Sequence, residues 1–200
     1  MDALLSTTYF GPVQWYQKLC RAEYVEIEQW ESFQKQTYRN RCLIAATNGV
    51  QALTIPIERG TSPLIKDIRI SDHGNWRHLH WNALQSAYGE SPFFDYYQDD
   101  IQPFFEKKWD FLLDYNEDIR LKICELIDIQ PHVSFTVGYS SSPSVMDYRS
   151  AINPKHPEPD PDFVPKPYYQ VYQQKHGFLQ NLSILDLLFN MGPESIYYVL

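Results

Sequence analysis

The fold class follows from residues 4–28, which read LLSTTYFGPVQWYQKLCRAEYVEIE. Residues 4–9 suit a strand, and the turn at Gly11-Pro12 leads into a helical stretch. Residues 23–28 then alternate charged or polar with apolar side chains, which is the period of a half-buried strand. A strand, a helix and a strand in this order predict a βαβ-like unit, and therefore an α/β fold.

The middle of the chain predicts a β-hairpin. Residues 41–46 and 50–57 are β-rich runs joined through Asn48-Gly49, and Asn-Gly is a strong hairpin signal because both residues tolerate positive φ.

A further strand is expected over residues 65–70. The remaining expected elements are a helix over 76–88 capped by Asn75, helices holding residues 101–112 and 119–127, the second capped by Asn116, a strand at 132–137, and a final helix that Ser183 caps and Gly192-Pro193 ends.

A proline-rich stretch at about 140–167 interrupts this order of elements. It holds seven of the 14 prolines, which lack the backbone N–H that a sheet ladder needs, so we expect an extended crossing or a partly mobile loop. Two hundred residues fit one hydrophobic core of ordinary size. The sequence therefore predicts a single mixed-sheet domain over residues 1–200, with an N-terminal βαβ-like unit, a hairpin and several packed helices.

Composition excludes several classes of partner. The formal net charge of −8 argues against charge-driven binding to nucleic acid or anionic lipid. No apolar run is long enough to span a bilayer, and the first residues lack the pattern of a signal peptide, so we expect a cytoplasmic protein without membrane insertion. The three cysteines are odd in number and widely spaced, so reduced thiols are expected.

The usual nucleotide and hydrolase motifs are missing. The chain contains no P-loop, no G-x-G-x-x-G and no G-x-S-x-G, so a P-loop enzyme or a dinucleotide dehydrogenase is not expected. The sequence does not identify a cofactor. His78 and His80 are two residues apart on an expected helix and point in nearly opposite directions, so we expect no shared metal ion.

His80 lies near the middle of the apolar stripe of the expected helix 76–88. A buried imidazole must find a hydrogen-bond partner or line a cavity. One alternative is a satisfied core histidine, and the other is a general base or substrate donor with Arg77 at the edge of the same face. Trp76 on this helix could stack against a sugar ring.

Residues 36–41 form the densest polar and basic cluster of the chain. If the cluster is extended, Arg39 and Arg41 project on one side beside Asn40 and could grip a phosphate or a carboxylate with forked hydrogen bonds. The alternative is ordinary ion pairing with an acidic residue of the preceding segment: Glu26, Glu28 or Glu31.

Tyr9 and Gln14 flank the point where the first strand gives way to the first helix. In α/β folds, ligands bind at the carboxyl ends of strands, so both side chains are candidates for substrate contact. A tightly packed turn without a ligand is the alternative.

The ordered set of motifs resembles the WbqC-like protein family. The matching pieces span nearly the whole chain: Tyr9-Phe10-Gly11-Pro12, Tyr24-Val25-Glu26-Ile27-Glu28, Thr37-Tyr38-Arg39-Asn40-Arg41, Leu53-Thr54-Ile55-Pro56-Ile57, Trp76 with His80, Ala87-Tyr88, Ser91-Pro92-Phe93-Phe94, and Leu182 to Asn190. Two departures are Thr7-Thr8, where many relatives have Gln-Pro, and the short proline-rich stretch, where many have a longer polar segment.

The resemblance implies a role in bacterial surface-polysaccharide (O-antigen) synthesis. Transfer of glycine or another acyl group to a sugar has been proposed for some members, and an activity housed in the shortened proline-rich region would be altered here. We therefore expect a transferase that takes a small-molecule substrate, either a sugar nucleotide, an amino acid or an acyl donor. In it, Arg39 and Arg41 hold an anionic group and His80 assists proton transfer. The alternative is a non-catalytic binding or assembly protein for a sugar nucleotide or a partner enzyme.

Overall fold

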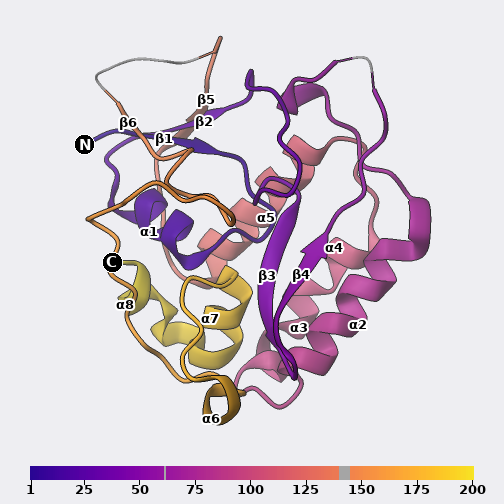
Figure 1. Cartoon of the computed structure of the whole chain (residues 1–200), viewed down its shortest axis with the longest axis vertical. Coiled ribbons are helices and arrows are strands. Elements are labelled where there is room, and N and C mark those ends of the chain that lie inside the picture. The colour runs from indigo at the N-terminus through magenta and orange to yellow at the C-terminus, as the bar shows by residue number, and fades with distance from the viewer. Residues whose placement is uncertain (61, 140–144) are drawn as a thin grey trace.

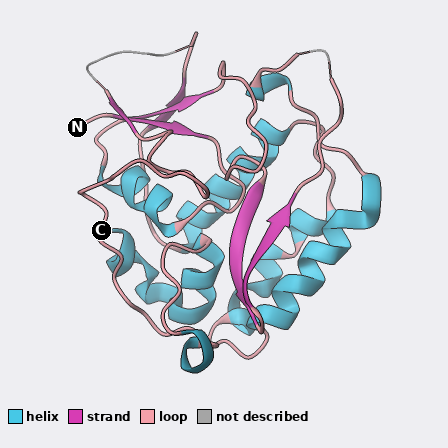
Figure 2. Cartoon of the chain, in the orientation of Figure 1, coloured by secondary structure: helices cyan, strands magenta, loops and turns pink. Residues whose placement is uncertain are grey.

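A computed structural model describes residues 1–60, 62–139 and 145–200 (Figure 1). It shows the expected mixed α/β fold, with a four-stranded parallel sheet in the order β5-β2-β1-β6, a separate antiparallel hairpin and several packed helices. Figure 2 shows the small sheet at one end of the molecule, with helices and the hairpin filling the rest.

The predicted βαβ-like unit is present at the N-terminus. β1 (Ala3–Ser6) and β2 (Val25–Glu28) pair in parallel, and α1 (Val13–Arg21) connects them. Trp15 on α1 is 2% exposed, and its indole N–H donates to the Ser6 carbonyl oxygen at 2.9 Å, which fixes the helix against the end of β1. The first strand is shorter than the expected residues 4–9.

The sheet is completed by β5 (Val133–Phe135) beside β2 and β6 (Met146–Asp147) beside β1. β6 lies inside the proline-rich stretch and corrects the prediction of a region without a ladder: the Tyr148 N–H donates to the Leu4 carbonyl oxygen at 3.0 Å. A short ladder is possible because residues 144–153 contain no proline. Residues 140–144 of the expected loop lie outside the described residues.

The hairpin is formed by β3 (Arg41–Ala46) and β4 (Gly49–Thr54), as Asn48-Gly49 predicts. Gly49 has a φ of 113°, a value that favours glycine. The hairpin runs through the centre of the molecule between α2 (Trp76–Tyr88) and α7 (Ile184–Met191), and β3 contacts both helices (Figure 1).

Residues 65–70 do not form the expected strand. Ile65–Asp67 is a 3-10 helix, and only isolated bridges follow, such as that between Ile70 and Ile57. The backbone N–H groups of this segment donate to separate partners, including the carbonyl oxygens of Glu31 and Asp110, instead of to one neighbouring strand.

The helices expected in the middle of the chain need three corrections. The stretch 101–112 is broken: α3 (Phe94–Ile101) and α4 (Pro103–Glu106) end before α5 (Leu112–Leu126) begins, with Pro103 starting α4. Asn116 does not cap a helix; it is buried inside α5, and its amide donates to the Arg39 carbonyl oxygen. Asn75 precedes α2 without a side-chain cap because it is left-handed, with a φ of 48°.

The C-terminal part packs against α1 and the hairpin. It contains α6 (Gln173–His176), α7 and α8 (Ile196–Val199); Ser183 caps α7 as expected, by accepting from the Leu185 N–H. Asp186 on α7 is fully buried and accepts hydrogen bonds from Tyr88, Tyr168 and Gln170. In the part of the chain that is described, no helix has the length and apolarity needed to cross a bilayer.

Candidate functional site

The four strands of the sheet are parallel, so their carboxyl ends meet at one edge. The chain passes from β1 to β2 and β5 on one side and then returns to β6 on the other side of β1. In open α/β sheets, such a reversal of strand order leaves a crevice at the carboxyl edge, where ligands bind. The register pairs Ser6 with Glu28 and Leu4 with Asp147, so it brings Arg149 to the same edge.

Glu28 ends β2 and is a charged residue held at the sheet edge without exposure to solvent (0% exposed). Its Oε1 atom accepts from the Thr136 hydroxyl at 2.9 Å and from the Trp30 backbone N–H at 2.7 Å. Its Oε2 atom lies 3.7 Å from the Arg149 guanidinium. Buried carboxylates need such partners because desolvation strongly disfavours an isolated charge.

Arg39 forms the ion pair that the sequence left open as an alternative. Its Nε and Nη2 atoms donate to the Glu31 carboxylate at 2.7 and 2.6 Å, and both side chains are almost fully buried. Nη2 also donates to the Ser6 hydroxyl at 2.7 Å, and Nη1 donates to the Thr37 hydroxyl at 3.2 Å. A guanidinium has five N–H donors. Among the described residues, one N–H of Nη1 therefore has no partner.

Arg149 follows β6 and lies beside Glu28 and Glu31. Its guanidinium forms a forked pair with Asp147, with Nη2 at 2.6 Å, and lies 3.9 Å from Glu31. The hydrogen bonds that Arg149 donates to the Asp147 carboxylate raise the pKa of Arg149, so it stays charged. Burial acts to raise the pKa of Asp147, but hydrogen bonds from Arg149 outweigh it and hold that pKa below its ordinary value.

These side chains face a cleft of about 630 Å³, a size typical of small-molecule sites. Its walls come from the loop after β2, the segment before β3, the segment after β5, and β6 with the segment that follows it. The residues that line it are Glu31, Ser32, Gln34, Arg39, Tyr139, Asp147, Arg149, Ser150, Asn153, His156 and Glu158.

The chain matches the model of the WbqC-like protein family over residues 7–156 and 158–198. It belongs to the WbqC-like protein family. It is also similar to the uncharacterized protein Rv1507c of Mycobacterium tuberculosis (strain ATCC 25618 / H37Rv), with 24% identity over 192 residues that cover 84% of this chain and 83% of that protein. No solved structure matches the chain.

In this WbqC-like protein Tyr9, which follows β1, contacts α2. The Tyr9 hydroxyl is hydrogen-bonded to Nδ1 of His80 at 2.8 Å, and the Trp76 ring packs edge-on against the imidazole. His80 is 6% exposed, and burial lowers its pKa to about 4. It is therefore a neutral imidazole at pH 7, held in an aromatic cluster that includes Phe105.

The arginines predicted for substrate binding lie in different surroundings. Arg39 lines the cleft of this WbqC-like protein, whereas the Arg41 guanidinium donates to the Thr54 hydroxyl within the hairpin. Arg77 pairs with Asp72 at 2.6 Å and lies over the Trp76 ring, beside a separate cavity of about 430 Å³. The three arginines are thus divided between the 630 Å³ cleft at the carboxyl edge of the sheet (the carboxyl-edge cleft), the hairpin and the region around α2.

Gln14 and Asn40 are engaged in bonds within the fold. The Gln14 amide donates to Asp160 at 2.8 Å and accepts from Asn181, which ties α1 to the proline-rich segment. The Asn40 amide donates to the Ile55 carbonyl oxygen at 2.8 Å. Their roles as substrate contacts in this WbqC-like protein stay predictions.

Sequence reasoning missed Glu28 and Arg149 as site residues. Alternation over residues 23–28 placed Glu28 on a polar face, but the sheet edge is covered and buries it. Arg149 was overlooked because it lies in the segment interpreted as a loop. The signal that could have identified both residues is their position at the ends of strands, because polar residues directly after parallel strands converge at one edge of the sheet.

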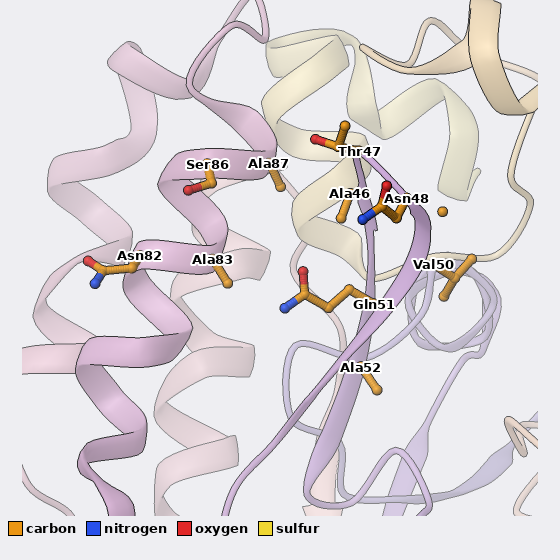
Figure 3. Close-up of a pocket in the computed structure, with 11 residues that line it drawn as sticks. Ala46, Thr47, Asn48, Val50, Gln51, Ala52, Asn82, Ala83, Ser86 and Ala87 are labelled. Carbon is orange, nitrogen blue, oxygen red and sulfur yellow. The ribbon is translucent and has the colours of Figure 1, made fainter.

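A third cavity, of about 720 Å³, lies between the tip of the hairpin and the C-terminal half of α2 (Figure 3). Figure 3 shows Ala83 and Ala87 facing the hairpin and Gln51 reaching toward the helix. None of the residues that line it is charged. The carboxyl-edge cleft is the strongest candidate of these three cavities, because it alone of the three brings together buried charged groups from several segments.

Proposed function

We propose that this WbqC-like protein is a cytoplasmic transferase that moves an acyl group, such as a glycyl or another aminoacyl group, onto a sugar in surface-polysaccharide synthesis. The observation that carries the proposal is the Arg39 guanidinium, which is buried, lines the cleft and retains one N–H donor of Nη1 without a partner among the described residues.

Acyl transfer places negative charge on the carbonyl oxygen in the transition state. A donor that is already fixed in position stabilises this charge without reorganisation, and it does so most strongly where water is excluded. Four hydrogen bonds to Glu31, Ser6 and Thr37 hold Arg39 in place. We infer that the remaining N–H of this fixed guanidinium serves as the donor for an acyl carbonyl oxygen.

The reaction forms one bond and breaks another. The oxygen of a sugar hydroxyl attacks the acyl carbon, a new C–O bond forms, and the bond between the acyl carbon and its leaving group breaks. The hydroxyl proton passes to His156, which lines the cleft, and then to the departing group. Proton transfer by His80, the assignment expected from sequence, stays a separate prediction, and its bond to Tyr9 favours a structural role.

The cleft also offers surfaces that suit a sugar. Tyr139 is 64% exposed at its rim, and its ring lies 5.2 Å from the Arg149 guanidinium. Aromatic rings stack well on the apolar faces of sugars. Ser150 and Asn153 add neutral hydrogen-bonding groups. These convergent polar groups favour a transferase over the alternative of a non-catalytic assembly protein, which would need an apolar docking patch instead.

The test is a transfer assay with mass-spectrometric detection, in which activated acyl donors are paired with nucleotide sugars. We expect a sugar product whose mass increases by one acyl group. Arg39→Lys should lower kcat by about 100- to 1000-fold, because a lysine cannot reproduce the fixed donor. The control is Arg69→Lys, an exposed arginine stacked on Phe111 away from the cleft. The proposal fails if no pair gives an acylated sugar, or if Arg39→Lys matches the wild type.

A further inference from the structure

The hairpin of β3 and β4 has an outer edge that the fold leaves open. In an antiparallel pair, the N–H and C=O groups of every second residue point away from the partner strand. The Ile55 N–H donates to the Asn40 carbonyl oxygen at 2.8 Å, and the register continues unbroken from there to the hairpin tip. By this alternation the backbone groups of Val50 and Ala52 point outward. In the described part of the chain, these groups have no hydrogen-bond partner.

The outer edge of β3 is satisfied by the rest of the fold. The Ala45 N–H donates to the Tyr88 hydroxyl at 3.2 Å, and the Leu43 carbonyl oxygen accepts from the Ser183 N–H at 2.8 Å. The two edges of the same hairpin therefore differ: one is paired within the chain, and the other presents its donors and acceptors to the outside.

The open part of the β4 edge is also unprotected. Thr54 at the far end of the strand is hydrogen-bonded to His80 through its backbone, which leaves Val50 and Ala52. Native proteins protect free edges with charged residues, prolines or bulges. Residues 49–54 read GVQALT, without a charge or a proline, and the pairing over residues 41–54 contains no bulge. The edge is therefore a template for another strand.

A groove beside this edge has room for such a strand. The cavity of about 720 Å³ lies between residues 46–52 and α2, and Figure 3 shows Ala83 and Ala87 facing the hairpin across it. Neither alanine extends beyond Cβ, so the helix leaves space for small side chains. Gln51 reaches toward the helix, and residues directly opposite one another on paired strands share a face. In an added strand, the residue opposite Gln51 would therefore face α2.

The charge at the hairpin tip sets the direction of the added strand. The Lys175 ammonium on α6 donates to the carbonyl oxygen of Thr47, a groove residue, at 2.6 Å. Within the described residues no carboxylate lies in ion-pair range of this ammonium. A strand antiparallel to β4 runs toward the tip, so its carboxyl end arrives beside Lys175. A parallel strand would bring its amino end there, and like charges would repel.

We propose that the open edge of β4 binds the C-terminal tail of another protein as an added antiparallel strand, with the terminal carboxylate beside Lys175. The tail is extended and uncharged, and the residues that face α2 are small. In strand addition of this kind, main-chain hydrogen bonds provide affinity and the side chains that face the groove provide specificity. The groove shares no residue with the carboxyl-edge cleft, so this interaction surface does not depend on acyl transfer.

The test is a titration of the ¹⁵N-labelled protein with the peptide acetyl-Ala-Thr-Ala-Thr-Ala, followed by amide chemical shifts. With its last residue opposite Gly49, its alanines face α2 and its threonines face away. The amides of Val50 and Ala52 should shift most, because they gain hydrogen bonds to the peptide. The same peptide with an amidated C-terminus should bind about tenfold more weakly, because it loses a charge-assisted hydrogen bond.

Two variants separate backbone pairing from charge. Ala52→Pro removes an outward N–H and no bond to β3, and proline is tolerated on strand edges that face solvent. It should weaken peptide binding at least about tenfold. Lys175→Gln should weaken binding of the free acid about tenfold and leave binding of the amide unchanged. The matched control is Lys107→Gln, an exposed lysine after α4, which should bind both peptides as the wild type does.

The amide spectrum of each variant shows whether the hairpin is intact, and the exposed Lys175 gives a decisive variant even if Ala52→Pro disturbs the strand. The proposal is overturned if the peptide shifts neither edge amide, if the amidated peptide binds as tightly as the free acid, or if Lys175→Gln or an intact Ala52→Pro binds like the wild type. Shifts of the Val50 and Ala52 amides that follow protein concentration without peptide would assign the edge to a second copy of the chain and overturn it as well.

Discussion

Removal of the Glu31 carboxylate tests most directly whether the buried ion pair between Glu31 and Arg39 stabilises the fold around the cleft. In Glu31→Ala the Arg39 guanidinium loses its bonds at 2.7 and 2.6 Å while it stays 5% exposed. An uncompensated buried charge costs about 3–5 kcal/mol of unfolding free energy. For a chain of this length, about 1 kcal/mol corresponds to roughly 2–4 °C in Tm, so Tm should fall by about 6–20 °C.

The measurement is urea denaturation followed by tryptophan fluorescence, with calorimetry for Tm. The matched control is Glu125→Ala on α5, which removes an exposed carboxylate 2.8 Å from Lys122. Exposed pairs of this kind contribute little, so the control should lose less than about 0.5 kcal/mol.

A double variant separates the buried charge from other effects of the substitution. Glu31→Ala combined with Arg39→Met removes both charges, and replacing a buried ion pair by apolar groups is often neutral. The double variant should therefore be more stable than Glu31→Ala alone. The reasoning is refuted if Glu31→Ala loses less than about 1 kcal/mol, or if the double variant is the less stable of the two.

Three further predictions concern the buried polar groups. Tyr9→Phe should lose about 1–3 kcal/mol in urea unfolding, because Nδ1 of His80 is left buried without its partner; a loss below about 0.3 kcal/mol would contradict this. Burial lowers the pKa of His80 to about 4, so the unfolded chain binds a proton that the folded chain does not, and stability should fall as pH drops from about 6.5 toward 4; the fall should be smaller in His80→Gln. Burial raises the pKa of Asp186 despite the three hydrogen bonds that it accepts. Protonation of Asp186 therefore stabilises the folded state fully below the ordinary pKa near 3.8, and this stabilisation is lost as pH rises through the folded pKa. Asp186→Asn should lack this loss of unfolding free energy in the same pH series.

Local sequence signals predicted those elements that short-range physics determines. Asn48-Gly49 fixes the hairpin because the turn needs positive φ, and the polarity pattern of residues 4–28 predicted two strands joined by a helix. Residues 65–70 look like a strand by composition, but their N–H groups find scattered partners after folding. Pairing over long distances is a tertiary property, so alternation alone could not exclude a 3-10 helix there.

The site was only partly predictable for the same reason. Arg39 stood out as a basic residue in an acidic chain, and the structure places it in the cleft. Its partner Glu31 was one of three acids that could not be distinguished by spacing. Arg149 reaches the site only because β6 pairs with β1, a contact between residues more than 140 positions apart. The sequence singled out Tyr9 and His80 separately, and the hydrogen bond that joins them links residues 71 positions apart.

The central claim is that the N–H of Arg39 that remains available receives an acyl carbonyl oxygen. A crystal structure of the protein with glycinamide tests it most directly. The account predicts ligand density in the cleft, with the carbonyl oxygen at hydrogen-bond distance from Nη1 of Arg39. Density confined to the cavity at the hairpin tip, or to the one beside Trp76 and Arg77, would contradict it.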